Sequence, residues 1–217
     1  MKLFEMYRLF LLFLFTSFTA VAQPMKYLAL GDSYTIGESV APEERWPVQL
    51  AERLRQQGRS VEGPTIIATT GWRTDNLKNG MTIARLQPEY DLVSLLIGVN
   101  NQYQGKPLEP YKEEFEALLQ EAIRLAKGDK NRVFVVSIPD YGYTPFGKSK
   151  QEKISRELDA FNEANRVIAE KWGVKYFNIT DISRQGLDQP ELVAADGLHP
   201  SGKMYSLWVD RILPGLR

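Results

Sequence analysis

Short apolar runs alternate with longer amphipathic stretches along most of the chain. Five runs are rich in β-branched and other apolar residues, and they predict strands over residues 27–30, 65–68, 92–97, 132–138 and 175–178. Between them, apolar side chains recur every three or four residues, as they do on a helix that buries one face. This spacing predicts helices over residues 46–57, 74–86, 111–127, 154–172 and 201–213.

The alternation of strands and helices indicates the fold class. Parallel strands need long crossover connections, and a helix is the usual crossover. The run over residues 92–97 is almost continuously apolar, as expected for a central strand that is buried on both faces. No internal repeat, low-complexity tract or linker interrupts the pattern. We therefore expect one α/β domain, a three-layer α/β/α sandwich around a five-stranded parallel sheet. In such a fold the ligand crevice lies beyond the carboxyl ends of the strands.

The first 22 residues have the pattern of a secretory signal peptide. Lys2 and Arg8 precede an apolar run over residues 9–15, and Ala20-Val21-Ala22 matches the small-x-small sequence that signal peptidase cleaves, here before Gln23. The apolar run is too short to span a bilayer comfortably, and an uncleaved N-terminal anchor is the alternative. We expect residues 1–22 to be a signal peptide and residues 23–217 to form the folded domain. The mature protein would then be exported, periplasmic or extracellular, without a stable membrane anchor.

The composition limits the possible partners and cofactors. The 217 residues include 27 basic and 27 acidic side chains, which gives no electrostatic case for a nucleic-acid or anionic-membrane partner. There is no cysteine, so disulfides, thiolate metal sites and a cysteine nucleophile are excluded. With a single histidine as well, a zinc site is disfavoured. We therefore expect no metal and no other cofactor.

A serine and a histidine stand near opposite ends of the pattern, each beside a predicted element. Ser33, within Gly31-Asp32-Ser33-Tyr34, follows the first predicted strand, and His199 precedes the last predicted helix. A serine is a poor nucleophile unless a base accepts its proton, and that base is usually a histidine oriented by a carboxylate. His199 is the chain's one histidine, and Asp196 stands three residues before it. We therefore predict that Ser33, His199 and Asp196 form a catalytic triad.

Glycine and polar residues also follow the second and third predicted strands. Thr69-Thr70-Gly71 comes after one of them, and Gly98-Val99-Asn100-Asn101 comes after the other. Taken alone, each segment is a common turn or cap signal. Because the carboxyl ends of parallel strands meet at one edge of a sheet, we expect these segments to share a crevice with Ser33. There they would supply polar donors for an oxyanion.

This combination resembles the SGNH branch of the GDSL esterases and lipases, whose separate sequence blocks carry a Ser, a Gly, an Asn and a His. Ser33, Gly71, Asn100 and His199 match those residues in order, and Asp196 matches the acid of the Asp-x-x-His block. The resemblance extends over residues 31–199. One position departs from the pattern, because Asn101 stands where the family has an Asp that is thought to organise the loop. The departure puts the local hydrogen bonding in question more than the chemistry.

The resemblance implies both a fold and an activity. The fold is a flavodoxin-like three-layer sandwich. The activity is hydrolysis of carboxylic esters, either lipid acyl or carbohydrate O-acetyl esters, through an acyl-enzyme intermediate of the lysophospholipase or esterase type. It also implies an oxyanion hole formed by the backbone N–H groups of Ser33 and Gly71 and the side-chain amide of Asn100. The expected partner is a small-molecule, lipid or carbohydrate ester.

Two alternatives belong to other classes of protein. Residues 142–149 fit the phosphate-loop pattern Gly-x4-Gly-Lys-Ser, which would indicate a nucleotide-binding protein. Pro145 weakens this interpretation, because proline lacks the N–H that a phosphate cradle needs. The aromatic residues Tyr141, Tyr143 and Phe146 would instead line an acyl or sugar pocket, or pack on the edge of the sheet. The second alternative is a flavodoxin-like binding module without catalysis, which the joint presence of the three triad residues disfavours.

Overall fold

The computed structural model describes residues 23–216. The predicted signal peptide, residues 1–22, lies outside the described residues, so its cleavage stays a prediction. The strands are β1 (Tyr27–Gly31), β2 (Thr65–Ala68), β3 (Leu92–Leu96), β4 (Val133–Val136) and β5 (Lys175–Phe177). The α-helices are α1 (Ser33–Ile36), α2 (Trp46–Gln56), α3 (Thr74–Ile83), α4 (Val99–Tyr103), α5 (Leu108–Leu125), α6 (Gln151–Trp172), α7 (Thr180–Ser183) and α8 (Gly202–Ile212).

The five strands form one parallel sheet in the order β2-β1-β3-β4-β5. Every residue of β1, β3 and β4 is buried, whereas the edge strands β2 and β5 each begin with an exposed residue. A strand that is covered by helices on both faces has no solvent-exposed face for polar side chains, which explains the continuous apolar runs in the sequence. The predicted three-layer sandwich with five parallel strands is confirmed.

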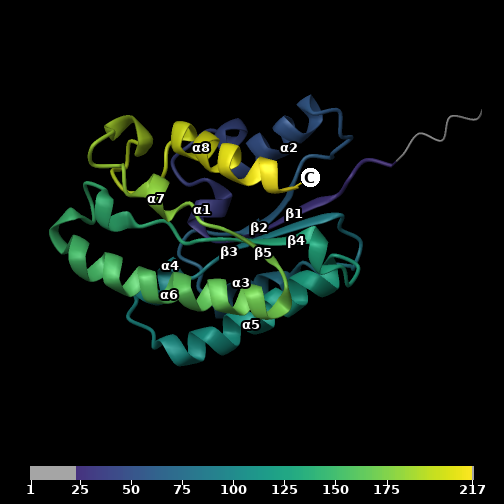
Figure 1. Ribbon diagram of the computed structural model, residues 1–217, viewed down its shortest axis with the longest axis horizontal. Helices are drawn as coiled ribbons and strands as arrows, with labels where there is room; N and C mark the ends of the chain where they lie inside the picture. The colour runs from purple at the N-terminus through teal and green to yellow at the C-terminus, as the bar shows by residue number, and fades with distance from the viewer. Residues whose placement is uncertain (1–22, 217) are drawn as a thin grey trace, which may run out of the picture.

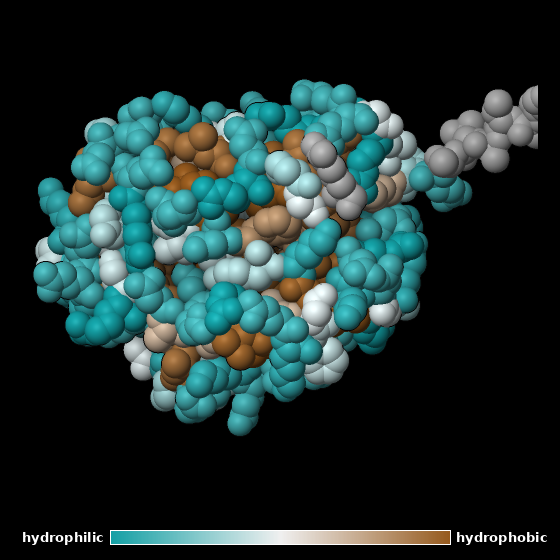
Figure 2. Space-filling view, viewed as in Figure 1, coloured by the Kyte–Doolittle hydropathy of each residue, from teal (hydrophilic) through white to brown (hydrophobic). Residues whose placement is uncertain are grey.

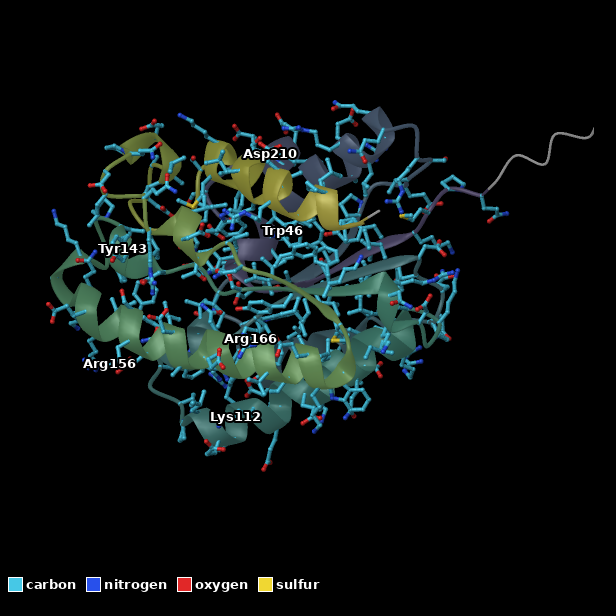
Figure 3. The ribbon with its side chains drawn as sticks, in the orientation of Figure 1. Trp46, Lys112, Tyr143, Arg156, Arg166 and Asp210 are labelled. Carbon is cyan, nitrogen blue, oxygen red and sulfur yellow. The ribbon has the colours of Figure 1, made fainter. Side chains whose placement is uncertain are left out.

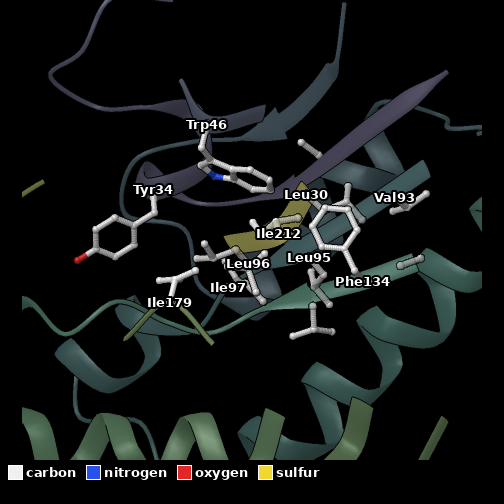
Figure 4. Close-up of a cluster of buried hydrophobic side chains, with 14 of the residues drawn as sticks. Leu30, Tyr34, Trp46, Val93, Leu95, Leu96, Ile97, Phe134, Ile179 and Ile212 are labelled. Carbon is white, nitrogen blue, oxygen red and sulfur yellow. The ribbon is translucent and has the colours of Figure 1, made fainter. Parts of the chain in front are cut away.

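The helices cover the two faces of the sheet (Figure 1). On one face lie α1, α2 and α8, with α2 packed on α8; on the other lie α3, α5 and α6, with α5 between its two neighbours. Figure 4 shows part of the core, where Leu30, Leu95 and Ile212 are fully buried. Trp46 packs edge-on against Phe134 in the same cluster, with ring centroids 6.3 Å apart. The apolar stripes of the helices and the apolar strands therefore meet as the periodicity predicts.

Some boundaries differ from the prediction for identifiable reasons. Helix α5 begins at Leu108 rather than at residue 111, and it carries Pro110 in its first turn. Proline is tolerated there because the first N–H groups of a helix have no intrahelical acceptor. The sequence pattern did not predict α1, α4 or α7, which have four or five residues each. Elements of about one turn are too short to show a helical period.

The surface of the described residues is mainly hydrophilic on the face seen in Figure 2. Apolar residues show between hydrophilic ones in separate groups rather than as one continuous area. Within residues 23–216, no helix combines the length and the apolar character that crossing a membrane requires.

Candidate active site

Strand β1 leads directly into the segment that carries Ser33. Asp32 caps the one-turn helix α1, and its Oδ1 accepts a hydrogen bond from the N–H of Tyr34, 3.1 Å away. A side chain at Gly31 would place its Cβ 2.2 Å from Thr35 Oγ1 and 2.5 Å from the Leu96 carbonyl oxygen, so only glycine allows α1 and β3 to pack this closely here. Ser33 is the first residue of α1 and is 4% exposed. Its hydroxyl has no hydrogen-bond partner among the described residues.

The register of the sheet aligns the ends of three neighbouring strands. Gly31 of β1 stands level with Ala68 of β2 on one side and with Leu96 of β3 on the other. Because β1 lies between β2 and β3, the segments that follow the three strands leave the sheet side by side. The structure therefore brings Ser33 to the same edge as the segments that carry the other predicted oxyanion residues.

Those two segments are joined by a hydrogen bond and shaped by glycines. The Asn100 side-chain amide donates to the carbonyl oxygen of Trp72, 3.0 Å away, which links the segment after β3 to the segment after β2. Gly71 has a φ of +83°, a left-handed conformation that favours glycine, and it is exposed. Gly98 has a φ of +130°, and a Cβ there would lie 2.5 Å from the Tyr111 hydroxyl. These glycines allow the sharp turns that set the positions of the two segments.

Asn101, the position that departs from the family pattern, keeps the loop organised. Its Oδ1 accepts from the N–H of Thr74 at 3.2 Å, and its Nδ2 donates to Thr74 Oγ1 at 2.8 Å. The Thr74 hydroxyl in turn donates to Glu114. A carboxylate at 101 accepts only, so the amide is the group that lets the hydroxyl donate its own proton to Glu114. With Asn at this position, the loop is therefore still held by side-chain hydrogen bonds.

Asp196 folds back onto His199 as the sequence predicts. Asp196 Oδ2 lies 2.6 Å from His199 Nδ1, and its Oδ1 accepts from the N–H groups of Leu198 and His199 at 2.9 and 3.0 Å. Gly197 takes a left-handed φ of +71° between them. Although burial by itself raises the pKa of Asp196, the hydrogen bonds from His199, Ser39 and the backbone lower this pKa well below its ordinary value. The Asp196 carboxylate is therefore ionised at neutral pH.

The ionised carboxylate determines which imidazole nitrogen carries the proton. A carboxylate only accepts hydrogen bonds, so His199 Nδ1 must be the donor in the 2.6 Å contact. In the neutral ring, Nε2 then has a free lone pair. Among residues 23–216, no hydrogen-bond partner is present for Nε2. The contact with Asp196 therefore fixes both the orientation and the tautomer of the ring.

The segment that carries Asp196 and His199 packs against α1 and the loop after it. The rings of Tyr34 and His199 meet edge-on, with centroids 5.7 Å apart. Ser39 Oγ donates to Asp196 Oδ2 at 2.7 Å. The structure thus places His199 beside Tyr34, the residue that follows Ser33. Within the described chain, no hydrogen bond joins the side chains of Ser33 and His199. Hydrogen bonds between a nucleophile and its base are often long before substrate binds.

Two further groups at this site were missed by the sequence reasoning. Ser39 has no motif that would reveal it, because its partner Asp196 is 157 residues away. Asp32 is part of the matched block, but the sequence does not show that its carboxyl group is fully buried. Its Oδ2 has no hydrogen-bond partner among the described residues. Burial raises the pKa of Asp32 to about 7, against the lowering effect of hydrogen bonds from the backbone.

The raised pKa of Asp32 predicts a pH-dependent stability. Below the ordinary pKa of 3.8, Asp32 is protonated in both the folded and unfolded states. As pH rises towards 7, the unfolded state ionises first, so the free energy of unfolding falls, by about 4 kcal/mol in all. We expect Asp32→Asn to remove most of this decline, which runs between about pH 4 and pH 7. Urea unfolding at both pH values measures it, with the exposed Asp188→Asn as control. Parallel curves for wild type and Asp32→Asn would contradict the assignment.

Residues 142–149, which fit the phosphate-loop pattern, do not form a phosphate-binding loop in this structure. Such a loop needs free backbone N–H groups that converge on the phosphate. Here the N–H of Gly142 donates to Asp140 Oδ1, that of Phe146 donates to the carbonyl of Gly197, and those of Gly147 and Lys148 donate to the carbonyl or hydroxyl of Thr144. The geometry of residues 142–149 therefore argues against nucleotide binding.

Comparison with known proteins agrees with the fold and the matched blocks. A sequence profile of the GDSL-like lipase/acylhydrolase family matches residues 29–207. An arylesterase of Vibrio mimicus is 30% identical, with the match covering 90% of each chain. The solved structure of TesA superposes with a TM-score of 0.71 at 16% identity, covering 89% of this chain and 98% of that one.

Two solved esterases share the fold at similarly low identity. The acetylxylan esterase Axe2 of Geobacillus stearothermophilus gives a TM-score of 0.65 at 20% identity, covering 88% of this chain and 94% of that one. The psychrotrophic esterase EstA of Pseudoalteromonas sp. gives 0.67 at 18% identity, covering 88% and 96%. The profile match and the 30% identical relative identify the chain more closely than these structures do. The chain belongs to the GDSL-like lipase/acylhydrolase family and is a carboxylic ester hydrolase.

Proposed function

We propose that the chain hydrolyses carboxylic esters through an acyl-enzyme intermediate formed on Ser33, with His199 as general base and Asp196 as the group that orients it. The observation that carries the proposal is the 2.6 Å contact between Asp196 and His199 Nδ1, beside the helix that begins with Ser33. A histidine held in this tautomer accepts a proton at Nε2. The role of Asp196 is to stabilise the imidazolium that forms, without taking the proton itself.

The reaction follows from these positions in two halves. Ser33 Oγ attacks the carbonyl carbon of the ester while its proton passes to His199 Nε2. The tetrahedral intermediate collapses, the bond to the alcohol oxygen breaks, and the alcohol leaves with the proton from His199. Water then attacks the acyl group, His199 takes the proton of the water and returns one to Ser33 Oγ, and the carboxylic acid is released.

The negative charge that develops on the carbonyl oxygen needs donors. We assign this task to the backbone N–H groups of Ser33 and Gly71 and to the side-chain amide of Asn100. The Asn100 amide has two hydrogens, and its bond to the Trp72 carbonyl uses one of them. That bond holds the amide in place, which supports a preorganised donor. Each such donor typically contributes about 10²–10³-fold to the rate.

The substrate range and the location follow from the relatives and from the N-terminal sequence. The arylesterase and the acetylxylan esterase among the similar proteins support small-molecule and carbohydrate esters, and the family description supports lipid esters. The signal-peptide pattern of residues 1–22 supports export to the periplasm or beyond.

Covalent labelling tests the proposal at the level of one atom. A fluorophosphonate probe should react with Ser33, whose Oγ displaces fluoride from phosphorus while His199 accepts the proton. The structure of the similar esterase EstA is described as inhibited by monoethylphosphonate, which supports the choice of probe. Mass spectrometry of the labelled peptide locates the adduct, and urea-unfolded protein is the control. Active protein that stays unlabelled, or that is labelled at another residue, would refute the assignment of Ser33.

A further inference from the structure

A cavity of about 470 Å³ lies between α4, the loop after β4 and the start of α6. Its lining includes Tyr103, Tyr141 and Phe146, whose ring centroids are 6.1–6.3 Å from one another. Ile154 and Phe161, both buried, also contribute to the lining. Tyr103 is 59% exposed and Phe146 is 51% exposed. Large apolar rings left open to solvent around a cavity are a feature of binding sites.

The cavity adjoins the candidate catalytic residues. Tyr141 lines both this cavity and a second, much smaller cavity whose lining includes His199. The N–H of Phe146 donates to the carbonyl oxygen of Gly197, between Asp196 and His199, at 3.0 Å. Helix α4 carries Asn100 near its start and Tyr103 at its end. The cavity therefore lies next to the segments that carry His199 and Asn100.

The charged residues that line the cavity are mainly basic. Lys106, Lys150 and Lys153 all line it, and Glu157 is the one acidic residue among the lining residues. Glu157 accepts a hydrogen bond from Gln102 at 2.7 Å and lies 3.8 Å from Lys153 Nζ. Within the described chain, neither Lys106 nor Lys150 has an acidic side chain within ion-pair distance. Figure 3 shows Tyr143 and Arg156 at the same end of the molecule, where the loop after β4 meets α6.

We propose that this cavity selects ester substrates that carry an anionic group, with the apolar part of the substrate on the aromatic rings and the anion near Lys106 and Lys150. The proposal rests on the ester hydrolysis proposed above and adds the charge class of the substrate. The aromatic rings of the cavity alone would accept any apolar group. The two lysines without acidic partners favour a carboxylate or a phosphate, because either anion gains attraction there that a neutral group of the same shape lacks.

Pairs of esters that differ only in charge test the proposal. For carboxylates, the mono-p-nitrophenyl esters of glutaric and suberic acid are compared with the neutral p-nitrophenyl valerate and octanoate. For phosphates, a lysophosphatidic acid is compared with the monoacylglycerol that has the same acyl chain. The quantity measured is the ratio of kcat/KM for the anionic ester to that for its neutral partner. The arm with the higher ratio identifies the source of the anion.

We expect Lys106→Glu combined with Lys150→Glu to lower this ratio by about tenfold or more. The kcat/KM for the neutral esters should stay within about twofold, because neither lysine belongs to the proposed triad or oxyanion hole. The ratio of the wild type should also fall as salt is raised from about 50 to about 500 mM, since salt screens exposed charges. Lys106→Gln with Lys150→Gln should give a smaller change in the same direction.

Lys148→Glu is the matched control. Lys148 is exposed and belongs to the same short helix as Lys150, yet it does not line the cavity. The proposal would be overturned if the wild type and the double-glutamate variant had equal ratios of kcat/KM. It would also be overturned if Lys148→Glu lowered the ratio as much as the double variant does, or if the double variant lost as much kcat/KM on neutral esters as on anionic ones. Failure of the proposed function has a different signature, because neutral-ester turnover would then survive Ser33→Ala.

Discussion

Ser33→Ala should lower kcat for p-nitrophenyl acetate by about 10⁴-fold or more. Alanine removes the one oxygen that we assign to the acyl bond, so the acyl-enzyme route is closed. The residual rate would come from the oxyanion donors and from binding, which still stabilise attack by water. The substitution removes one hydroxyl that has no hydrogen-bond partner within residues 23–216, so the fold should tolerate it. Steady-state kinetics and thermal unfolding together measure both effects.

Ser60→Ala is the matched control for this variant. Ser60 is exposed in the loop between α2 and β2, and it lines a cavity at the amino end of the sheet, away from Ser33. It should keep the full rate and the full thermal stability. A Ser33→Ala variant with a rate near that of the wild type would remove Ser33 from the mechanism and leave the ester hydrolase with another nucleophile.

Asp196→Asn should lower kcat by about 10⁴-fold. The amide Nδ2 of asparagine can donate to His199 Nδ1, and this reverses the hydrogen bond that the carboxylate imposes. Nε2 would then carry the proton of the neutral ring and have no lone pair for the Ser33 hydroxyl. The loss should persist at higher pH, because the tautomer rather than the charge of the ring is wrong. The rate of fluorophosphonate labelling at Ser33 should fall in parallel.

Ser39→Ala separates this effect from a general loosening of the loop. It removes one hydrogen bond to Asp196 Oδ2 but leaves the carboxylate and its contact with His199. We expect a loss of less than about tenfold in kcat, because the tautomer is preserved. If Asp196→Asn and Ser39→Ala had equal effects, Asp196 would serve only to hold the loop.

The fold was predicted correctly from the sequence where burial produces a regular pattern of apolar residues. The run at residues 92–97 is continuously apolar because β3 is covered on both faces, and this property can be read without coordinates. Helix α6 likewise shows its buried side in the spacing of Leu158, Phe161 and Ile168. The one-turn helices α1 and α4 leave no such trace, yet they carry Ser33 and Asn100.

At the candidate site, the sequence predicted a contact correctly where the two residues are close in the chain. Asp196 and His199 are three residues apart, so their contact depends on one turn around Gly197. The pairing of Asn101 with Thr74 could not be predicted, because it joins loops that follow different strands. The full burial of Asp32 depends on the tertiary packing, and residue type alone does not reveal it.

By itself, the sequence determined the order of strands and helices and the residue types available for catalysis, since both depend on neighbours a few positions apart. The tertiary structure decided which of those residues meet. The strand order β2-β1-β3 places the segment with Ser33 between the segments with Gly71 and Asn100, and the packing of residues 196–199 on α1 places His199 beside it. It also gathered lysines from the loop after α4, the short helix before α6 and α6 itself around one aromatic cavity. Contacts between distant segments depend on how whole layers pack, which no local pattern in the chain encodes.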